Sequence, residues 1–255
     1  KKVEVDVSGR EQLVLAEIPP TAGRHVVLGI DSEWQKHLED ALKRALRVAN
    51  AKRASAIVLD PKTGTIRAMV SLPAYDNNDF IGGISTEKYQ ALLQDSDQPL
   101  FNRALSGTYP SGSTIKPVLA AAGLEEDIIT RATTILSTGG IEVGQWFFPD
   151  WKAGGHDTTN VVKALAESVN TFFYTLGGGY REIKGLGVEK ITAYFRLFGF
   201  GDRLGIDLPG ESPGFIPSPA WKEQKKHEPW YIGDTYNISI GQGDFLTTPL
   251  QIAVA

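Results

Sequence analysis

The sequence predicts an α+β fold, in which strands and helices are segregated along the chain. Two short apolar segments joined by a turn occupy residues 54–72, whereas helical periodicity prevails between residues 114 and 198. The regular βαβ succession that would indicate a parallel sheet is not seen. The chain has 255 residues, which is enough for one large domain with its own hydrophobic core.

The first residues predict a strand and a linker. Val3, Val5 and Val7 alternate with charged residues, which is typical of a half-buried strand. The Pro-Pro pair at residues 19–20 interrupts regular structure and indicates a linker. The apolar run at residues 25–30 then predicts a second short strand.

A helix is expected over residues 33–50, with Asp31 or Ser32 as its N-cap. Apolar side chains recur along it at helical spacing and predict one buried face, made of Trp34, Leu38, Ala41, Leu42, Ala45, Leu46 and Ala49. We therefore assign Trp34 to the core and not to a binding surface.

Residues 54–59 and 65–72 predict the two strands of an antiparallel hairpin. Residues 60–64 between them read Asp-Pro-Lys-Thr-Gly, which is tight-turn chemistry because proline restricts φ and glycine tolerates positive φ. The Gly- and Pro-rich stretch at 199–219 is expected to be mostly loop. Before it, periodicity predicts helices at residues 114–126, 159–167, 171–176 and 188–198.

The composition excludes several classes of function. Lys and Arg number 26 against 30 Asp and Glu, which argues against a nucleic-acid partner because phosphate neutralisation needs a basic surface. No cysteine is present, so disulfides and thiolate chemistry are excluded. The longest apolar run, residues 118–124, is far shorter than the roughly 18 residues of a membrane helix. The chain begins at Lys1 and ends at Ala255 in an apolar stretch, so we expect a fragment of a longer protein.

The sharpest chemical signal is the pair Ser113 and Lys116, which follows a turn and opens an apolar helix. At this spacing the two side chains lie one helical turn apart on the same face. A serine hydroxyl needs a neighbouring base to become a nucleophile, and a lysine can be that base when burial lowers its pKa. The motif alone leaves open the alternative of a serine N-cap with an exposed lysine.

A second signal is the pair Ser168 and Asn170, which separates two apolar segments. Residues two apart in an extended or looped segment can point the same way, so a hydroxyl and an amide could enter one pocket. Ser168 could then relay a proton, and Asn170 could bind a substrate amide. A simple polar break between two helices is the alternative.

Ser-x-x-Lys followed by Ser-x-Asn is the motif order of the penicillin-recognising serine enzymes. Further segments resemble class B penicillin-binding proteins, namely residues 60–64, 109–117, 205–211 and 240–243. Residues 228–235 are most similar to the elongation-type peptidoglycan D,D-transpeptidases of that class. The resemblance covers nearly the whole chain, which is identified as a fragment of such a transpeptidase domain.

The resemblance implies the fold shared by penicillin-binding transpeptidases and serine β-lactamases, an antiparallel sheet flanked by helices with an all-helical part beside it. Residues 1–24 are expected to form the end of an N-terminal pedestal region and a linker, and residues 25–255 the transpeptidase domain. The C-terminal strands are expected to be missing. The family's Lys-Thr-Gly motif should lie beyond Ala255, so we expect this fragment to be inactive alone.

The resemblance also implies the chemistry. Ser113 would attack the D-Ala-D-Ala carbonyl of a peptidoglycan stem peptide, with Lys116 as the base. Ser168 and Asn170 would complete the proton path and the substrate contacts. The acyl-enzyme would pass to an amine of a neighbouring stem and cross-link the cell wall, and β-lactams would acylate Ser113. No cofactor is expected.

The family is anchored in the inner membrane and holds this domain in the periplasm, where it supports cell shape. The resemblance therefore implies a membrane glycosyltransferase as a partner, in addition to stem peptides and β-lactams. The sequence also leaves open a noncatalytic penicillin-binding sensor or a scaffold of the wall-elongation complex. A β-lactamase is disfavoured, because no Glu-x-x-x-Asn loop stands out between residues 170 and 210.

Three further features of the sequence need an assignment, namely a possible metal site, a second Lys-Thr-Gly and a basic cluster. Some elongation-type members hold zinc with carboxylates, His and Cys near the second motif; Asp150 and His156 resemble part of that region, but without cysteine we expect no metal. The Lys-Thr-Gly at residues 62–64 precedes Ser113 and lies in a turn, so we expect it to be exposed and outside the site. A solvated basic face is expected from Lys222, Lys225, Lys226 and His227.

Overall fold

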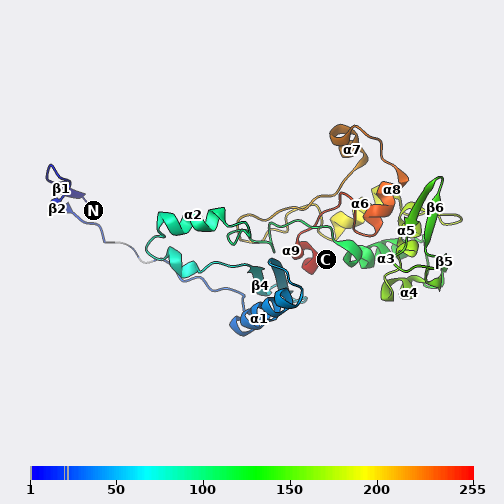
Figure 1. The fold of residues 1–255 in the computed structure, drawn as a ribbon, viewed down its shortest axis with the longest axis horizontal. Coiled ribbons are helices and arrows are strands. Elements are labelled where there is room, and N and C mark those ends of the chain that lie inside the picture. The colour runs from blue at the N-terminus through cyan, green and yellow to red at the C-terminus, as the bar shows by residue number, and fades with distance from the viewer. Residues whose placement is uncertain (1, 20, 22) are drawn as a thin grey trace.

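The structure is a computed structural model that describes residues 2–19, 21 and 23–255, and it confirms the α+β fold (Figure 1). Within the described residues the strands pair in two-stranded antiparallel sheets. No described helix is both long and apolar enough to cross a bilayer. The elements in chain order are β1 (Lys2–Val5), β2 (Glu11–Ala16), α1 (Ser32–Val48), β3 (Ala54–Leu59), β4 (Ile66–Leu72), the 3₁₀ helix η1 (Asn77–Phe80), α2 (Thr86–Gln94), the 3₁₀ helix η2 (Gly112–Ile115), α3 (Lys116–Glu125), β5 (Ile135–Ser137), β6 (Gly140–Val143), β7 (Trp146–Pro149), β8 (Asp157–Thr159), α4 (Val161–Ala166), α5 (Asn170–Gly178), α6 (Gly187–Leu197), α7 (Pro219–Lys226), α8 (Ile232–Ser239) and α9 (Pro249–Val254).

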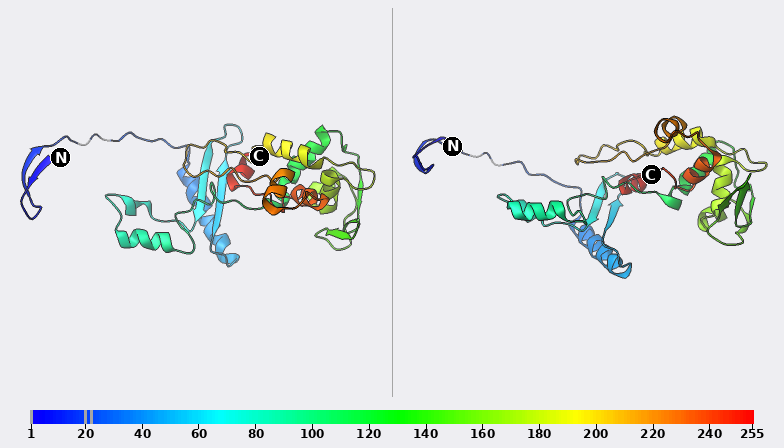
Figure 2. Two further views of the ribbon diagram at one scale, coloured as in Figure 1. Left: turned by 90° about the horizontal axis from the view of Figure 1, so that it is seen from above. Right: turned by 45° about the horizontal axis from the view of Figure 1, so that its top comes forward.

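The N-terminal strand prediction is confirmed as a strand but not as a half-buried one. β1 pairs with β2 in a hairpin, with Val3 opposite Val14. This hairpin stands apart from the rest of the described chain in both Figure 1 and Figure 2. Val5 is accordingly 51% exposed, since nothing in the described residues covers it. Of the predicted linker, Pro20 lies outside the described residues.

The strand predicted at residues 25–30 is wrong. The segment has no strand structure, and Val26, Val27 and Leu28 are all largely exposed. An apolar run becomes a strand only when a neighbouring strand satisfies its backbone groups, and the sequence cannot show whether one is available. Leu28 to Ile30 lie beside the hairpin of β3 and β4 without strand pairing, and just after the segment Asp31 N–H donates to the Arg67 carbonyl at 2.8 Å.

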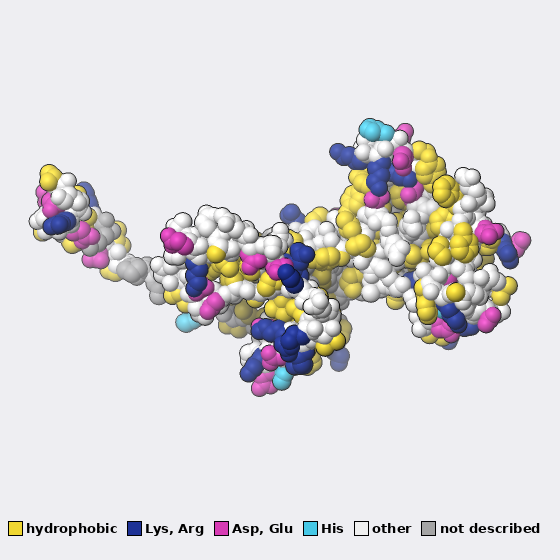
Figure 3. Space-filling view, viewed as in Figure 1, with side chains coloured by type: hydrophobic (Ala, Val, Ile, Leu, Met, Phe, Trp, Pro, Cys, Tyr) yellow, Lys and Arg dark blue, Asp and Glu magenta, His cyan; other side chains and the backbone are white. Residues whose placement is uncertain are grey.

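Helix α1 begins at Ser32, one residue before the predicted start. Asp31, one of the two predicted caps, accepts from the N–H groups of Glu33 and Trp34 at 3.0 and 3.1 Å. Its contacts with β3 and β4 leave much of the apolar face uncovered. Trp34 is 57% exposed, so its assignment to the core is wrong. A 3.6-residue period identifies a face, but the width of the neighbouring element decides how much of that face is covered. Figure 3 shows charged side chains of both signs mixed over the outer side of α1.

The hairpin of β3 and β4 is confirmed, with Ala54 opposite Leu72 and a bulge near Leu59. Its turn closes through Gly64 N–H, which donates to the Asp60 carbonyl at 2.8 Å, and Gly64 adopts the positive φ that the turn requires. Helix α1 packs against both strands and α9 against β3, so helices flank this sheet as expected (Figure 2).

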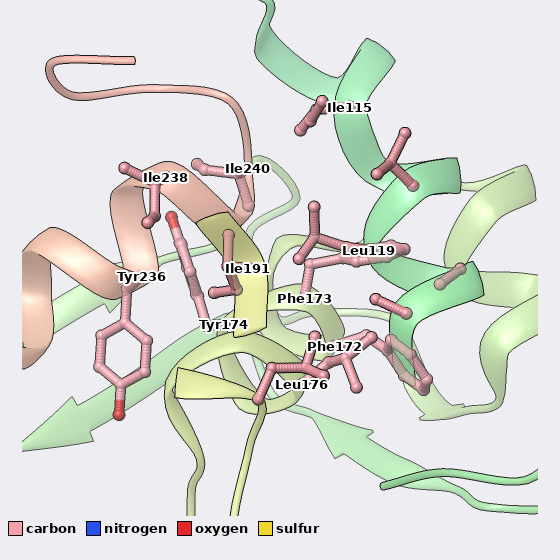
Figure 4. Packing of buried hydrophobic residues seen from close by; sticks show 14 of the residues in the cluster. Ile115, Leu119, Phe172, Phe173, Tyr174, Leu176, Ile191, Tyr236, Ile238 and Ile240 are labelled. Carbon is pink, nitrogen blue, oxygen red and sulfur yellow. The ribbon is translucent and has the colours of Figure 1, made fainter. Parts of the chain in front are cut away.

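A separate helical part contains most of the hydrophobic core and carries the residues of the site. Helix α5 lies in its centre and packs against α3, α4, α6 and α8. Figure 4 shows Leu119 of α3, Phe172 and Phe173 of α5, Ile191 of α6 and Tyr236 of α8 gathered around this contact. Because α5 is buried from Thr171 to Gly177, its first turn is held in place by packing on all sides.

The four predicted helices of this part all exist, with shifted boundaries. The helix expected at residues 114–126 divides into η2 and α3, and those expected at 159–167, 171–176 and 188–198 correspond to α4, α5 and α6. The stretch at 199–219 is mostly loop, as predicted, up to the start of α7 at Pro219. The sequence analysis missed the short strands β5 to β8, which are too brief to show a period.

The solvated basic face is right for Lys225 and Lys226 but wrong for Lys222. Lys222 is only 5% exposed, and its ammonium donates to Asp234 Oδ2 at 2.7 Å and lies 4.6 Å from the centre of the Tyr231 ring. These contacts join α7 to the start of α8. A buried cation is stable when it is paired and hydrogen-bonded, and its acidic partner lies twelve residues away, beyond any local pattern.

Candidate active site

Ser113 lies in η2, on the short 3₁₀ turn that leads into α3, and its side chain is exposed. The turn is tied to the C-terminal part of the chain by Gly112 N–H, which donates to the Gly241 carbonyl at 2.8 Å. A side chain at Gly241 would lie 2.1 Å from the Gly112 carbonyl oxygen, so only glycine allows this approach. Ser113 is thus held on a supported turn and remains open to a ligand.

Lys116 is buried, with 2% of its surface exposed, at the first turn of α3. Its backbone N–H donates to the Ser113 carbonyl, so the two residues are one turn apart as expected. Its ammonium donates to Ser168 Oγ at 3.0 Å, to the Ser168 carbonyl at 2.8 Å and to Asn170 Oδ1 at 2.7 Å. The geometry therefore excludes the alternative of an exposed lysine beside a serine cap.

The pKa of Lys116 is lowered to about 8, because burial disfavours the ammonium, while the negative charge of Asp150 acts in the opposite direction. A lysine with this pKa is partly neutral at physiological pH. It can therefore accept a proton, which an ordinary lysine, with a pKa near 10.5, rarely does. Phe173 of α5 contributes to this burial, with the centre of its ring 5.3 Å from the Lys116 nitrogen.

Ser168 and Asn170 face the same lysine because the chain bends sharply between α4 and α5. Ser168 adopts a left-handed conformation with φ of 55°, Val169 points into the core, and Asn170 begins α5. This bend places the Ser168 hydroxyl and the Asn170 amide on one side of the segment. The structure therefore brings together three of the four residues that the motifs predicted, and Ser113 lies one turn from Lys116.

Asp150 and His156 lie close together, and among the described residues no group of three or more His, Cys, Asp or Glu side chains is arranged so that it could hold a metal ion. The Asp150 oxygens accept hydrogen bonds from neighbouring N–H and O–H groups, and His156 Nδ1 lies 2.7 Å from Glu167 Oε2. Without a cysteine, these residues do not fit the zinc site of the resembled family. Burial raises the pKa of Asp150, but the hydrogen bonds from Thr171, Asn170 and Trp151 outweigh it and hold the pKa below its usual value.

Lys62 lies outside the site, as the sequence analysis expected. Its side chain is exposed in the turn between β3 and β4, and its backbone N–H donates to Asp60 Oδ1 at 2.9 Å. Figures 1 and 2 place this hairpin away from α4 and α5. The Lys-Thr-Gly at residues 62–64 is therefore a turn sequence and not the pocket motif.

In the whole protein, we expect Lys62→Ala to leave the rate of covalent penicillin labelling within about twofold of wild type and the stability within about 0.5 kcal/mol, because an exposed side chain is removed and the turn bond uses the backbone. The measurement is gel fluorescence with a fluorescent penicillin over a time course. A tenfold loss of rate in a folded variant would contradict this expectation.

The sequence alone did not identify two residues that support the site, Trp151 and Gly241. Trp151 Nε1 donates to the carbonyls of Glu167 and Ser168 at 3.0 and 3.1 Å and thereby covers the bend before α5. The Gly241 carbonyl accepts a hydrogen bond from Gly112 N–H and so supports the turn that carries Ser113. Both lie in segments that the resemblance had marked, around residues 148–156 and 240–243, but only the fold shows what they contact.

Comparison with known proteins identifies the family of the chain. A family model described as penicillin binding protein transpeptidase domain matches residues 54–255, so the chain belongs to the penicillin-binding protein transpeptidase family. Within the family it is similar to the class B members of the MrdA and PBP2 type. It is 39% identical over 257 residues to the peptidoglycan D,D-transpeptidase MrdA of Escherichia coli strain K12, an alignment that covers all of this chain and 38% of MrdA.

Solved structures show the same relationship. PBP2 in the complex of PBP2 and MreC from Helicobacter pylori matches with a TM-score of 0.81 and 37% identity, over 98% of this chain and 45% of that one. A chain from a structure titled "Structural coordination of polymerization and crosslinking by a peptidoglycan synthase complex" matches with a TM-score of 0.78 and 35% identity, over 98% of this chain and 44% of that one. The chain thus spans less than half the length of these relatives.

Proposed function

We propose that the protein carrying this chain is a peptidoglycan D,D-transpeptidase in which Ser113 is the nucleophile and Lys116 the base. The observation that carries the proposal is the buried Lys116 ammonium, which donates to Ser168 Oγ and Asn170 Oδ1 one turn after an exposed serine. Family membership and the activity named for the MrdA relatives support it.

In the first step, Ser113 Oγ bonds to the carbonyl carbon of the penultimate D-Ala of a stem peptide. Its proton passes to the neutral Lys116 amine, directly or through Ser168 Oγ, which lies 3.0 Å from that amine. The C–N bond to the terminal D-Ala then breaks, and this D-Ala leaves with a proton from Lys116.

In the second step, the amine of a neighbouring stem attacks the acyl-enzyme ester. The amine proton returns through Lys116 to Ser113 Oγ, and the two stems are left joined by an amide bond. Asn170 is suited to binding the substrate amide, because its Nδ2 remains available while its Oδ1 accepts from Lys116. A β-lactam presents the same kind of carbonyl and acylates Ser113, but its leaving group stays attached.

We further propose the division and the setting that the family resemblance implies. Residues 1–24 end a pedestal region and residues 25–255 belong to the transpeptidase domain, which acts in the periplasm of an inner-membrane-anchored protein. A membrane glycosyltransferase and an MreC-like protein are the proposed partners, supported by the titles of the two solved structures. Co-purification of the whole protein with these partners tests this part.

The activity is tested by incubating the whole protein with a stem pentapeptide donor and an amine acceptor. We expect mass spectrometry to show a cross-linked dimer that lacks one D-Ala, and an acyl adduct on the peptide that contains Ser113. A penicillin adduct on Ser113 without any dimer formation would instead support the noncatalytic sensor.

A further inference from the structure

Asp150 follows β7 in sequence, but its carboxylate binds the start of α5. The side chain is completely buried. Its Oδ1 accepts from Asn170 N–H at 3.1 Å, and its Oδ2 accepts from Thr171 N–H at 2.9 Å. The residue that precedes α5 is Val169, which has no side-chain oxygen and caps nothing. Asp150 therefore supplies from a distant loop the cap that the helix lacks in its own sequence.

The remaining lone pairs of Asp150 are also occupied. Thr171 Oγ1 donates to Oδ2 at 2.7 Å, Ser137 Oγ lies 3.4 Å from the same oxygen, and Trp151 N–H donates to Oδ1 at 2.8 Å. A carboxylate offers about four acceptor sites, and these five donors use all of them. The Asp150 carboxylate is thus fully hydrogen-bonded as a cap and has no lone pair left for a metal ion, whereas the buried His156 Nε2 beside it has no hydrogen-bond partner among the described residues.

The capping contacts of Asp150 involve the same segment that binds Lys116. Asn170, whose N–H Asp150 accepts, is also the residue whose Oδ1 accepts from Lys116 at 2.7 Å. Trp151, the neighbour of Asp150, donates from its indole to the Ser168 carbonyl, the same oxygen that accepts from Lys116. Adjacent residues of one loop thus hold both ends of the Ser168–Asn170 bend.

We propose that Asp150 is a positioning residue of the transpeptidase site, which caps α5 by direct hydrogen bonds so that Ser168 and Asn170 hold Lys116 beside Ser113, without a metal ion. The proposal rests on the function proposed above. It assigns to Asp150 a role in place of the zinc ligation that the sequence had left as a candidate.

Replacing Asp150 also removes a negative charge that acts on Lys116. The Asp150 charge raises the pKa of Lys116, against the larger effect of burial, so neutralising it lowers the pKa of Lys116 further. Other titratable groups near Asp150 are His156, whose Nε2 lies 3.7 Å from Asp150 Oδ1, and Glu167, which pairs with His156. Tyr174 is a third, and burial together with the Asp150 charge raises the pKa of its hydroxyl.

The experiment introduces Asp150→Asn into the whole protein and measures the second-order rate constant of its acylation by penicillin between pH 5 and pH 10. The rate is normalised to the fraction of protein molecules that become labelled when the reaction is complete, so that misfolded molecules do not count. The matched control is Asp31→Asn, which makes the same change at the cap of α1, away from the site. We expect Asp150→Asn to acylate roughly 10- to 100-fold more slowly, because a small misplacement of reacting groups has an effect of this size. We also expect the rise of its rate with pH to move to lower pH, and Asp31→Asn to behave as wild type.

Two further measurements keep the proposal testable if Asp150→Asn does not fold. Thr171→Val removes one donor to Asp150, and Thr171→Ser restores it; we expect a several-fold slower rate in the first and a rate near wild type in the second. We also expect wild type to keep its acylation rate after dialysis against EDTA.

The proposal is overturned by a wild-type rate in Asp150→Asn, by equal rates in the two Thr171 variants, or by a chelator-sensitive rate that zinc restores. If wild type itself is not acylated, the proposed function fails and not only the role of Asp150.

Discussion

Ser113→Ala is expected to abolish covalent labelling of the whole protein by a fluorescent penicillin and to abolish cross-linking. The label bonds to the hydroxyl oxygen of Ser113, and alanine has no such oxygen. The nearest other serine in the sequence is Ser111, which Gly112 separates from position 113. Ser113 is exposed, and the cap position of η2 belongs to Ser111, so we expect a change in stability of no more than about 0.5 kcal/mol. Gel fluorescence and the thermal midpoint measure the two effects.

Ser111→Ala is the matched control for this experiment. It removes the same group from the same turn and is expected to label at the wild-type rate, because Ser111 Oγ has only a long contact of 3.5 Å to the Gly112 carbonyl. Tryptic mass spectrometry of wild type should place the adduct on Ser113. An adduct on Ser111 or Ser168, or labelling that persists in Ser113→Ala, would show that the nucleophile is assigned wrongly.

Lys116→Arg is expected to slow acylation by on the order of 10²-fold or more, because arginine keeps the charge but has a pKa above about 12 and cannot act as a base. In wild type the pKa of Lys116 is about 8, so the acylation rate should rise as the pH increases toward 8 and then level off, as the ammonium loses its proton. The arginine variant should lose this rise. Stopped-flow acylation between pH 5 and pH 10 measures both effects.

Lys116→Met tests whether slow acylation in the arginine variant results from the missing base or from the larger arginine side chain, which fits the buried site poorly. Methionine keeps the length of the stem and removes the amine, so Ser168 Oγ and Asn170 Oδ1 lose one partner each, at a cost of about 1–3 kcal/mol for a buried group left unsatisfied. We expect this variant to fold and to acylate as slowly as the arginine variant. A wild-type rate in either folded variant would reduce Lys116 to a structural role.

Local features of the fold could be predicted because the residues that determine them are consecutive. The hairpin of β3 and β4 depends on a Pro and a Gly in its turn and on the apolar strands beside it, and it was predicted correctly. The cap of α1 at Asp31 and the helical periods of α4, α5 and α6 were found for the same reason. In each case the decisive atoms lie within a few residues of one another.

Predictions failed where burial depended on a neighbour from another part of the chain. Trp34 has the spacing of a core residue but lies on a flank of α1 that β3 and β4 leave uncovered. Lys222 was assigned to a solvated face because its partner Asp234 belongs to a different helix. The strand at residues 25–30 failed because no local pattern can show whether a neighbouring strand is available.

By itself, the sequence determined the candidate nucleophile, base and amide, because the spacings of Ser113, Lys116, Ser168 and Asn170 are local properties of two short motifs. It could not place the motifs together, since Lys116 and its acceptors are 52 and 54 residues apart along the chain. Only the tertiary structure decided that Lys116 is buried, which lowers its pKa, and that Asp150 caps α5. The physical reason is that desolvation and hydrogen bonding depend on which surfaces meet, and packing around α5 brings these surfaces together.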